Sequence, residues 1–143
     1  MFQKIKKLIF NKLLFNLAYV QLYENKIVAR DVDTGKEVSQ ISIDPFSHKR
    51  SILGNFAIAE NLLTESLKQI YEGSWFSPSP IMIIHPMELI DDGLTQIEVR
   101  ALAELGAGAG ARKVFVYTGD ELTNIELQGD LKRIKFLSAS TCS

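Results

Sequence analysis

The sequence predicts an α/β domain built on a five-stranded mixed sheet, and three observations support this fold class. Three short segments of strand composition come first and are joined only by turns. Two helical segments then alternate with two continuous apolar runs, which is typical of parallel strands connected by helical crossovers. The length of 143 residues suits one compact domain.

The first three strands are expected to form an antiparallel meander. Residues 14–23 are rich in leucine, valine and aromatic side chains, and residues 24–25 suit a tight turn before a second strand at residues 26–32. Residues 33–36, Asp-Thr-Gly-Lys, predict another turn, because aspartate bonds nearby backbone and glycine accepts a positive φ. Residues 37–43 alternate between polar and apolar side chains, as a third strand would.

Two helices are predicted after the meander. The first covers residues 56–71 and follows Asn55, a good N-cap. The second begins with a capping box, in which Thr95 is the N-cap and Glu98 the third helical residue. It is expected to end at the glycine-rich segment 106–110, which we interpret as a C-cap and packing turn. The segment resembles a phosphate-binding loop, but a helix C-terminus has free carbonyl groups and a negative dipole end, which do not bind phosphate. The stripe that the first helix should bury comprises Phe56, Ala59, Leu63, Leu67 and Ile70.

The remaining strands are continuous apolar runs. Residues 81–84 and 114–117 are apolar throughout, as expected for strands buried on both faces of a sheet. Beyond Gly119 we expect a short helix and a weak strand at residues 134–136. Residues 138–143 are predicted to be a disordered tail. The domain itself would then occupy residues 13–137, after an N-terminal segment of twelve residues.

This order of elements suggests a ribonuclease-H-like domain, the half-unit of actin-like folds. Two segments resemble a helix and the chain that leaves it in the MreB-type rod-shape-determining, bacterial actin-like family. They are residues 55–70, which begin with Asn-Phe-Ala-Ile-Ala-Glu, and residues 76–80, Phe-Ser-Pro-Ser-Pro. Residues 95–101 and 108–115 are similar to the next helix and strand of that family. The resemblance covers residues 14–117 and implies its subdomain IA.

Departures from the family imply that the chain binds no nucleotide cofactor and is not an ATPase. The family carries Asp-x-Gly-Thr in its first phosphate loop, whereas Gln21 here lacks the charge, Tyr23 blocks close approach and Glu24 repels phosphate. Thr-Gly-Asp at 118–120 stands where the family has its catalytic glutamate. Residues 45–54 are too few for subdomain IB, and we expect no second half to complete a cleft.

Two histidines and an acidic loop are the other candidates for chemistry. No cysteine or histidine lies at metal-ligand spacing from His48 or His85, so no metal site is predicted. His85 directly follows a buried strand, where we expect a hydrogen-bonded histidine. The alternative is a ligand site or small enzyme at the strand ends, using His85 and the loop at residues 88–92. If no ligand binds there, the carboxylates of that loop are expected to be solvated charges that also interact with the N-terminus of the nearby helix. They are Glu88, Asp91 and Asp92.

The N-terminal segment, residues 1–12, is basic and amphipathic. Members of the resembled family commonly use such a segment to lie on the inner membrane, where apolar burial and lysine attraction to anionic lipid supply the affinity. The alternative is that the segment packs on its own domain. The residues concerned are Phe2, Ile5, Leu8 and Ile9 on the apolar side and Lys4, Lys6 and Lys7 on the basic side.

Composition limits the function classes further. The formal net charge of −1 gives no basic field for nucleic acid. The single cysteine, Cys142, builds no disulfide framework and suits the cytoplasm. Trp75 and Phe76 favour either a hydrophobic core or an exposed anchor for a partner. We therefore expect a non-enzymatic interaction or adaptor protein linked to the bacterial cytoskeleton, cell shape or envelope, with a protein partner or a homo-oligomer as its complex.

Overall fold

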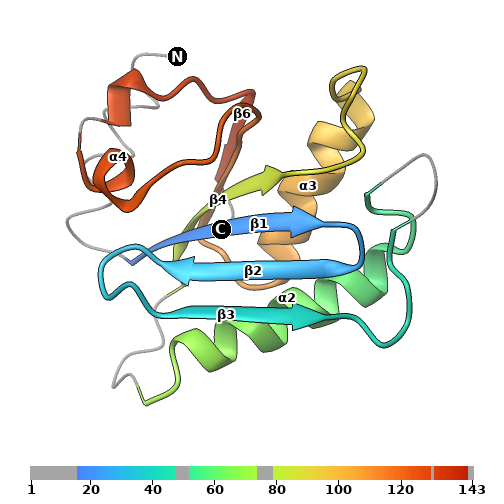
Figure 1. Ribbon diagram of the computed structural model, residues 1–143, viewed down its shortest axis with the longest axis horizontal. Helices are drawn as coiled ribbons and strands as arrows, with labels where there is room; N and C mark the ends of the chain where they lie inside the picture. The colour runs from blue at the N-terminus through green and yellow to red at the C-terminus, as the bar shows by residue number, and fades with distance from the viewer. Residues whose placement is uncertain (1–15, 48–51, 74–78, 130, 142–143) are drawn as a thin grey trace.

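The computed structural model describes residues 16–47, 52–73, 79–129 and 131–141. It shows an α/β fold around one sheet in the order β3-β2-β1-β4-β5-β6 (Figure 1). The strands are β1 (Leu17–Tyr23), β2 (Lys26–Asp31), β3 (Glu37–Ile41), β4 (Ile81–Pro86), β5 (Lys113–Val116) and β6 (Ser138–Thr141). The helices are α2 (Phe56–Ile70), α3 (Gln96–Gly108) and α4 (Asn124–Gln128), with a 3₁₀ turn η1 (Leu131–Arg133).

The predicted strand pairings are confirmed. β1, β2 and β3 form the antiparallel meander, and β1, β4 and β5 are parallel neighbours. The turn between β2 and β3 contains Gly35 at a φ of +76°. The side chain of Asp31 accepts hydrogen bonds from the backbone N–H of Thr34 at 3.1 Å and from its hydroxyl at 2.7 Å. Asp31, the last residue of β2, therefore holds the turn that follows it.

The C-terminal segment differs from the sequence prediction. Residues 138–141, predicted as part of a disordered tail, form β6, which pairs antiparallel with β5. The weak strand predicted at residues 134–136 is not formed. The Leu137 N–H donates to the Val116 carbonyl at 2.8 Å, so the pairing with β5 starts just before β6. The prediction was wrong because Ser-Ala-Ser-Thr carries no apolar pattern, and backbone pairing alone makes it a strand.

Helix α2 begins and packs as its sequence indicates. Asn55 is the N-cap, and its side chain accepts from the Ile58 N–H at 3.4 Å. Phe56 is half-buried, and the buried stripe includes Ser66 instead. The Ser66 hydroxyl lies 2.8 Å from the Leu62 carbonyl and 2.7 Å from Gln40 Oε1 on β3, so its burial leaves no polar group unpaired. Figure 1 shows α2 running behind β2 and β3.

Helix α3 has the predicted capping box between Thr95 and Glu98 but continues into the glycine-rich segment. A Cβ atom on Gly106 would lie 2.7 Å from Val114 Cγ2. Glycine therefore lets α3 approach β5 more closely than any other residue would. The Gly106 carbonyl accepts from the Ala111 N–H at 3.0 Å, and Gly110 takes a φ of +111°. The segment caps and packs the helix, as predicted, although the helix ends later than expected.

Two apolar clusters lie on the two faces of the sheet. The first packs α2 and α3 on alternate residues of the central strands, such as Val20, Met82 and Val114. The second lies on the other face, where α4 and η1 cover the remaining alternate residues, such as Leu17 and Ile83. This arrangement explains why β1, β4 and β5 are apolar on both faces.

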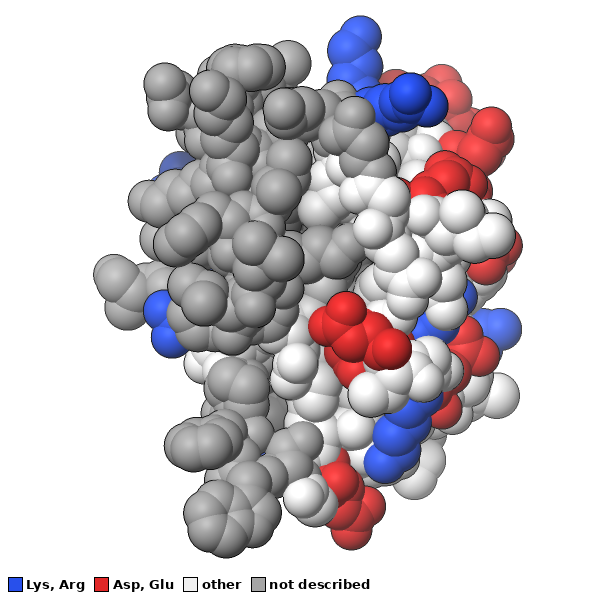
Figure 2. All heavy atoms as spheres, turned by 90° about the vertical axis from the view of Figure 1, so that its left-hand side faces the viewer, with Lys and Arg blue, Asp and Glu red and all other residues white. Residues whose placement is uncertain are grey.

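The described part of the face in Figure 2 is mixed in charge. Figure 2 shows basic and acidic side chains interspersed over the described part of one face, with neither sign dominating. Among the helices that the structure describes, none has the length and apolar character needed to cross a bilayer.

Leu63 should be a main contributor to stability, because its side chain is fully buried in the middle of α2. Leu63→Ala is expected to lower the free energy of unfolding by about 2–5 kcal/mol, through lost apolar burial and the cavity that remains. Urea unfolding measures this loss. Gln69→Ala, at an exposed position of the same helix, is the control and should change stability little. A loss well under about 1 kcal/mol for Leu63→Ala would contradict the assignment.

Candidate functional site at the carboxyl ends of the parallel strands

The candidate site lies where β1, β4 and β5 end, because parallel strands place their carboxyl ends at one edge of a sheet. The structure brings together here Gln21 and Tyr23 from β1, Glu24 from the following turn, His85 from β4 and Glu88 from the loop after it. The other predicted contact residues lie outside the described residues, namely Phe2, Lys4, Ile5, Lys6, Lys7, Leu8, Ile9, Trp75 and Phe76.

His85 is buried, with only 1% of its surface exposed, and both ring nitrogens are hydrogen-bonded. Nε2 lies 3.0 Å from the Gly119 carbonyl, which only accepts, so Nε2 carries the proton. Nδ1 then accepts from the Tyr19 hydroxyl at 2.6 Å. The Tyr19 oxygen in turn accepts from the Leu122 N–H at 3.2 Å. The prediction of a hydrogen-bonded strand-end histidine is confirmed.

The loop after β5 closes over the imidazole. The Tyr117 ring packs edge-on against His85, with ring centres 4.7 Å apart, and its hydroxyl donates to the Asp120 carbonyl at 2.9 Å. Gly119 takes a φ of +146°, and a Cβ there would come within 2.6 Å of the Tyr117 hydroxyl oxygen. Residues 118–120 therefore shield the histidine, a role that sequence reasoning missed.

Arg30 of β2 joins the same group from the neighbouring strand. Its guanidinium lies over the Tyr19 ring at 5.1 Å, and Nη2 donates to the Leu122 carbonyl at 3.1 Å. Leu122 is thus held through its N–H by Tyr19 and through its carbonyl by Arg30. The buried group links β1, β2, β4 and the segment that leads into α4.

Burial sets the protonation of this group. Desolvation lowers the pKa of His85 below its ordinary value, because a charged imidazole is disfavoured away from water. Desolvation also raises the pKa of Tyr19 to about 12. Both side chains are therefore neutral near pH 7, and the histidine has no free nitrogen with which to act as a base on a ligand.

The position that matches a phosphate loop is filled by the chain's own side chains. Gln21 is buried, and its Nε2 lies 3.8 Å from the Met87 sulfur. The Glu24 N–H donates to Glu88 Oε1 at 3.0 Å, so a carboxylate already occupies the acceptor position at this turn. Glu88 is exposed to solvent, as predicted, but its side chain bonds this turn and not the helix N-terminus.

The other loop carboxylates do not join the site. Asp91 and Asp92 are exposed. Within the described ranges, no group of three histidine, cysteine, aspartate or glutamate side chains is arranged to hold a metal ion. The acidic loop therefore contributes Glu88 alone to the strand ends.

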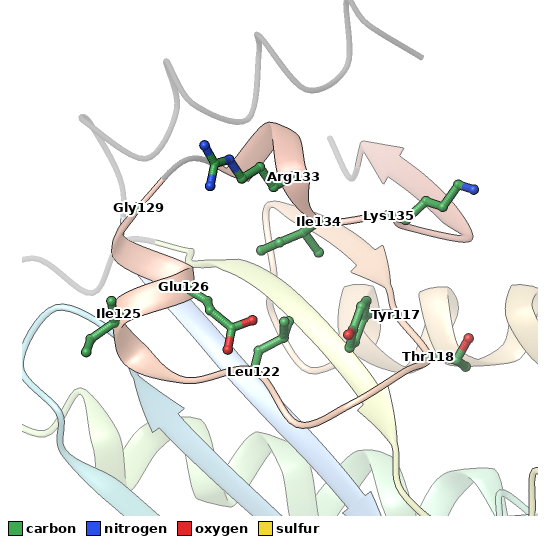
Figure 3. Close-up of a pocket in the computed structure, with 9 residues that line it drawn as sticks. All are labelled: Tyr117, Thr118, Leu122, Ile125, Glu126, Gly129, Arg133, Ile134 and Lys135. Carbon is green, nitrogen blue, oxygen red and sulfur yellow. The ribbon is translucent and has the colours of Figure 1, made fainter.

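A hollow of about 550 Å³ lies beside the site, on the face covered by α4 (Figure 3). Its apolar wall includes Leu122 and Ile134, and Tyr117 separates it from His85, which does not line it. Figure 3 shows Arg133 and Lys135 extending in opposite directions instead of converging. The described residues that line it are Tyr117, Thr118, Leu122, Ile125, Glu126, Gly129, Arg133, Ile134 and Lys135. The sequence did not indicate this hollow, because its walls meet only through tertiary packing.

Comparison with known proteins finds no matching family model. The chain is 33% identical over 103 residues to the uncharacterised protein YjaA of Escherichia coli K12, which covers 68% of this chain and 80% of YjaA.

The chain is also similar to the cell shape-determining protein MreB. It is 35% identical over 68 residues to MreB of Escherichia coli K12, and 33% identical over 78 residues to that of Haemophilus influenzae. These matches cover 48% and 54% of this chain but only 18% and 20% of the two MreB proteins. This partial similarity fits an actin-like half-domain, in agreement with the α/β fold.

The burial of neutral His85 predicts a pH dependence of stability. Its pKa is lowered in the folded state, so the unfolded chain binds more protons as the pH falls below about 6.5, and the free energy of unfolding should decrease there. His85→Gln should cost about 1–3 kcal/mol at pH 8 through lost buried hydrogen bonds but should flatten the slope between about pH 7 and pH 5. Urea unfolding at several pH values measures both effects. His48 lies outside the described residues, so Gln69→Ala, at an exposed position of α2, is the control and should keep the slope. An unchanged slope in His85→Gln would contradict the prediction.

Proposed function

This chain belongs to the family of YjaA of Escherichia coli and is similar over part of its length to MreB, and we propose that it is a non-enzymatic interaction protein linked to the bacterial cytoskeleton. The observation that carries the proposal is the occupied strand-end site. In an actin-like half-domain this edge would face a nucleotide, and here it holds buried and mutually bonded side chains.

The electrostatics of the site support this proposal. The Glu88 carboxylate accepts from the Glu24 N–H, and the Glu24 side chain follows on the same turn. Two carboxylates at this position disfavour the binding of a phosphate group, because negative charges a few ångströms apart repel each other. Burial keeps His85 neutral, and hydrogen bonds occupy both of its ring nitrogens, so it supplies neither positive charge nor a free base.

The proposed location is the cytoplasm, with a peripheral contact to the inner membrane through the basic amphipathic residues 1–12. Anionic lipid would attract the lysines of this segment, and its apolar residues would enter the interface. The partial similarity to MreB supports a protein partner in the same compartment.

A small-ligand-binding domain is the second candidate function. The hollow of about 550 Å³ beside Tyr117 favours it, because its size falls within the range of small-molecule sites. His85 and the acidic loop, the residues first considered for such a role, lie outside its lining. A ligand there would contact Leu122, Ile134 and Tyr117.

No specific binding of Mg-ATP is expected, because Gln21, Tyr23 and Glu24 replace the phosphate loop and Glu88 occupies its turn. Isothermal titration calorimetry should show no saturable heat, and a phosphate-release assay should show no turnover. MreB, measured in parallel, is the positive control. A dissociation constant in the micromolar range would overturn this part of the proposal.

Direct association with MreB is the second expectation. The purified chain should pellet with polymerised MreB from the same cell in a saturable manner. The same chain centrifuged without MreB is the control for self-pelleting and should stay in solution. If the chain remains in the supernatant at saturating MreB, the link to the cytoskeleton is wrong, whatever the outcome with ATP.

A further inference from the structure

Among the described residues, β3 is an edge strand of the sheet, with β2 as its hydrogen-bonded neighbour. On its inner side, the Lys36 carbonyl accepts from the Asp31 N–H at 2.8 Å, and the Ser42 N–H donates to the Asn25 carbonyl at 2.9 Å. Successive residues of an antiparallel strand turn their backbone groups to opposite edges. Even-numbered residues therefore bond β2, and Glu37, Ser39 and Ile41 direct their N–H and C=O groups outward.

Exposed apolar side chains accompany this edge. Ile41 is 75% exposed and Ile43 fully exposed. A hollow of about 490 Å³ lies between the end of β3 and α2, and Ile58 and Leu62 contribute to its lining. Proteins usually protect an edge strand with charges, proline or a bulge. Residues 38–43, Val-Ser-Gln-Ile-Ser-Ile, contain neither a charge nor a proline.

Opposite charges stand at the two ends of this uncharged stretch. Lys36 and Glu37 precede it, and Asp44 follows it. Glu37 forms an ion pair with Arg30 of β2 at 3.7 Å, so Lys36 and Asp44 are the opposite charges at the two ends. We propose that β3 pairs antiparallel with β3 of a second copy of this chain, so that a two-fold dimer continues the sheet across the interface. Such an interface is self-complementary, because each copy offers the same outward groups.

The outward groups define a register for this pairing. Ser39 lies opposite the partner's Ile41, so that both residues exchange backbone hydrogen bonds, and the two-fold axis passes beside Gln40. Lys36 and Asp44 lie just outside β3, and this register brings Lys36 towards the partner's Asp44 at each end. Ile41 lies diagonally across from the partner's Ile41, within reach of apolar contact.

The charges favour this arrangement over others. A parallel pairing in register would place Lys36 beside the partner's Lys36 and Asp44 beside the partner's Asp44, and like charges at that spacing are unfavourable. The antiparallel pairing replaces both repulsions with attractions. Self-pairing uses only the β3 edge, so its test is independent of the proposed link to MreB.

Sedimentation equilibrium of the full chain tests the dimer. Between about 1 and 100 µM, a range suited to interfaces of modest size, the mass should rise from monomer towards dimer. Ile41→Lys should give a monomer throughout. Ile97→Lys is the matched control, because Ile97 is 81% exposed on α3, and it should dimerise like the parent chain. Thermal unfolding followed by circular dichroism checks that both variants stay folded.

A backbone variant tests the edge itself. Ser39→Pro removes an outward N–H without touching the bonds to β2, and proline is tolerated on an edge strand. This variant should also be monomeric. If it is unfolded, Ile41→Lys still decides the matter.

Charge reversal tests the register. Lys36→Glu or Asp44→Lys alone should weaken dimerisation about tenfold, because each change acts twice in a two-fold interface. The double variant Lys36→Glu/Asp44→Lys should recover the parent affinity. A parent chain that stays monomeric at about 100 µM, equal effects of Ile41→Lys and Ile97→Lys, or a double variant without recovery would each overturn the proposal.

Discussion

The hydrogen bonds of His85 connect parts of the chain that are remote in sequence. Tyr19 and Gly119 bond its two nitrogens, and Arg30 and Tyr19 together hold Leu122. A buried polar group without a partner is costly, so these contacts depend on one another. The segment leading to α4 keeps its place over the second face of the sheet because Leu122 is fixed at this point.

Close packing on the other face is a second constraint. Gly106 allows α3 to approach β5, and the first apolar cluster fills the space between the helices and the sheet. The two faces meet at β4, whose residues are buried along its full length. The strand ends supported in this way carry the hydrogen-bonded side chains of the candidate site.

Much of the fold could be predicted from local patterns. Several patterns indicate an element and place its ends within a few residues of the observed ones. They are the alternation after Glu37, the apolar runs of β4 and β5, and the capping box at Thr95. The strand β6 could not be predicted, because its residues are polar and small and only pairing with β5 makes them a strand.

The site was only partly predictable. The position of His85 after a buried strand indicated a bonded histidine, but its partner Tyr19 lies 66 residues away. The contact between Glu88 and the Glu24 N–H spans 64 residues. No local pattern encodes such contacts, since they arise from the way in which the strands are brought together.

The central place of β1 has a consequence for the speed of folding. Short turns connect β1, β2 and β3, but β4, the other neighbour of β1 in the sheet, follows α2 in the sequence. Closing a long loop costs entropy before any contact compensates it. The meander should therefore form first, and its apolar faces stay exposed to solvent until β4 pairs with β1. During this interval the nascent protein is most exposed to aggregation and has most need of a chaperone.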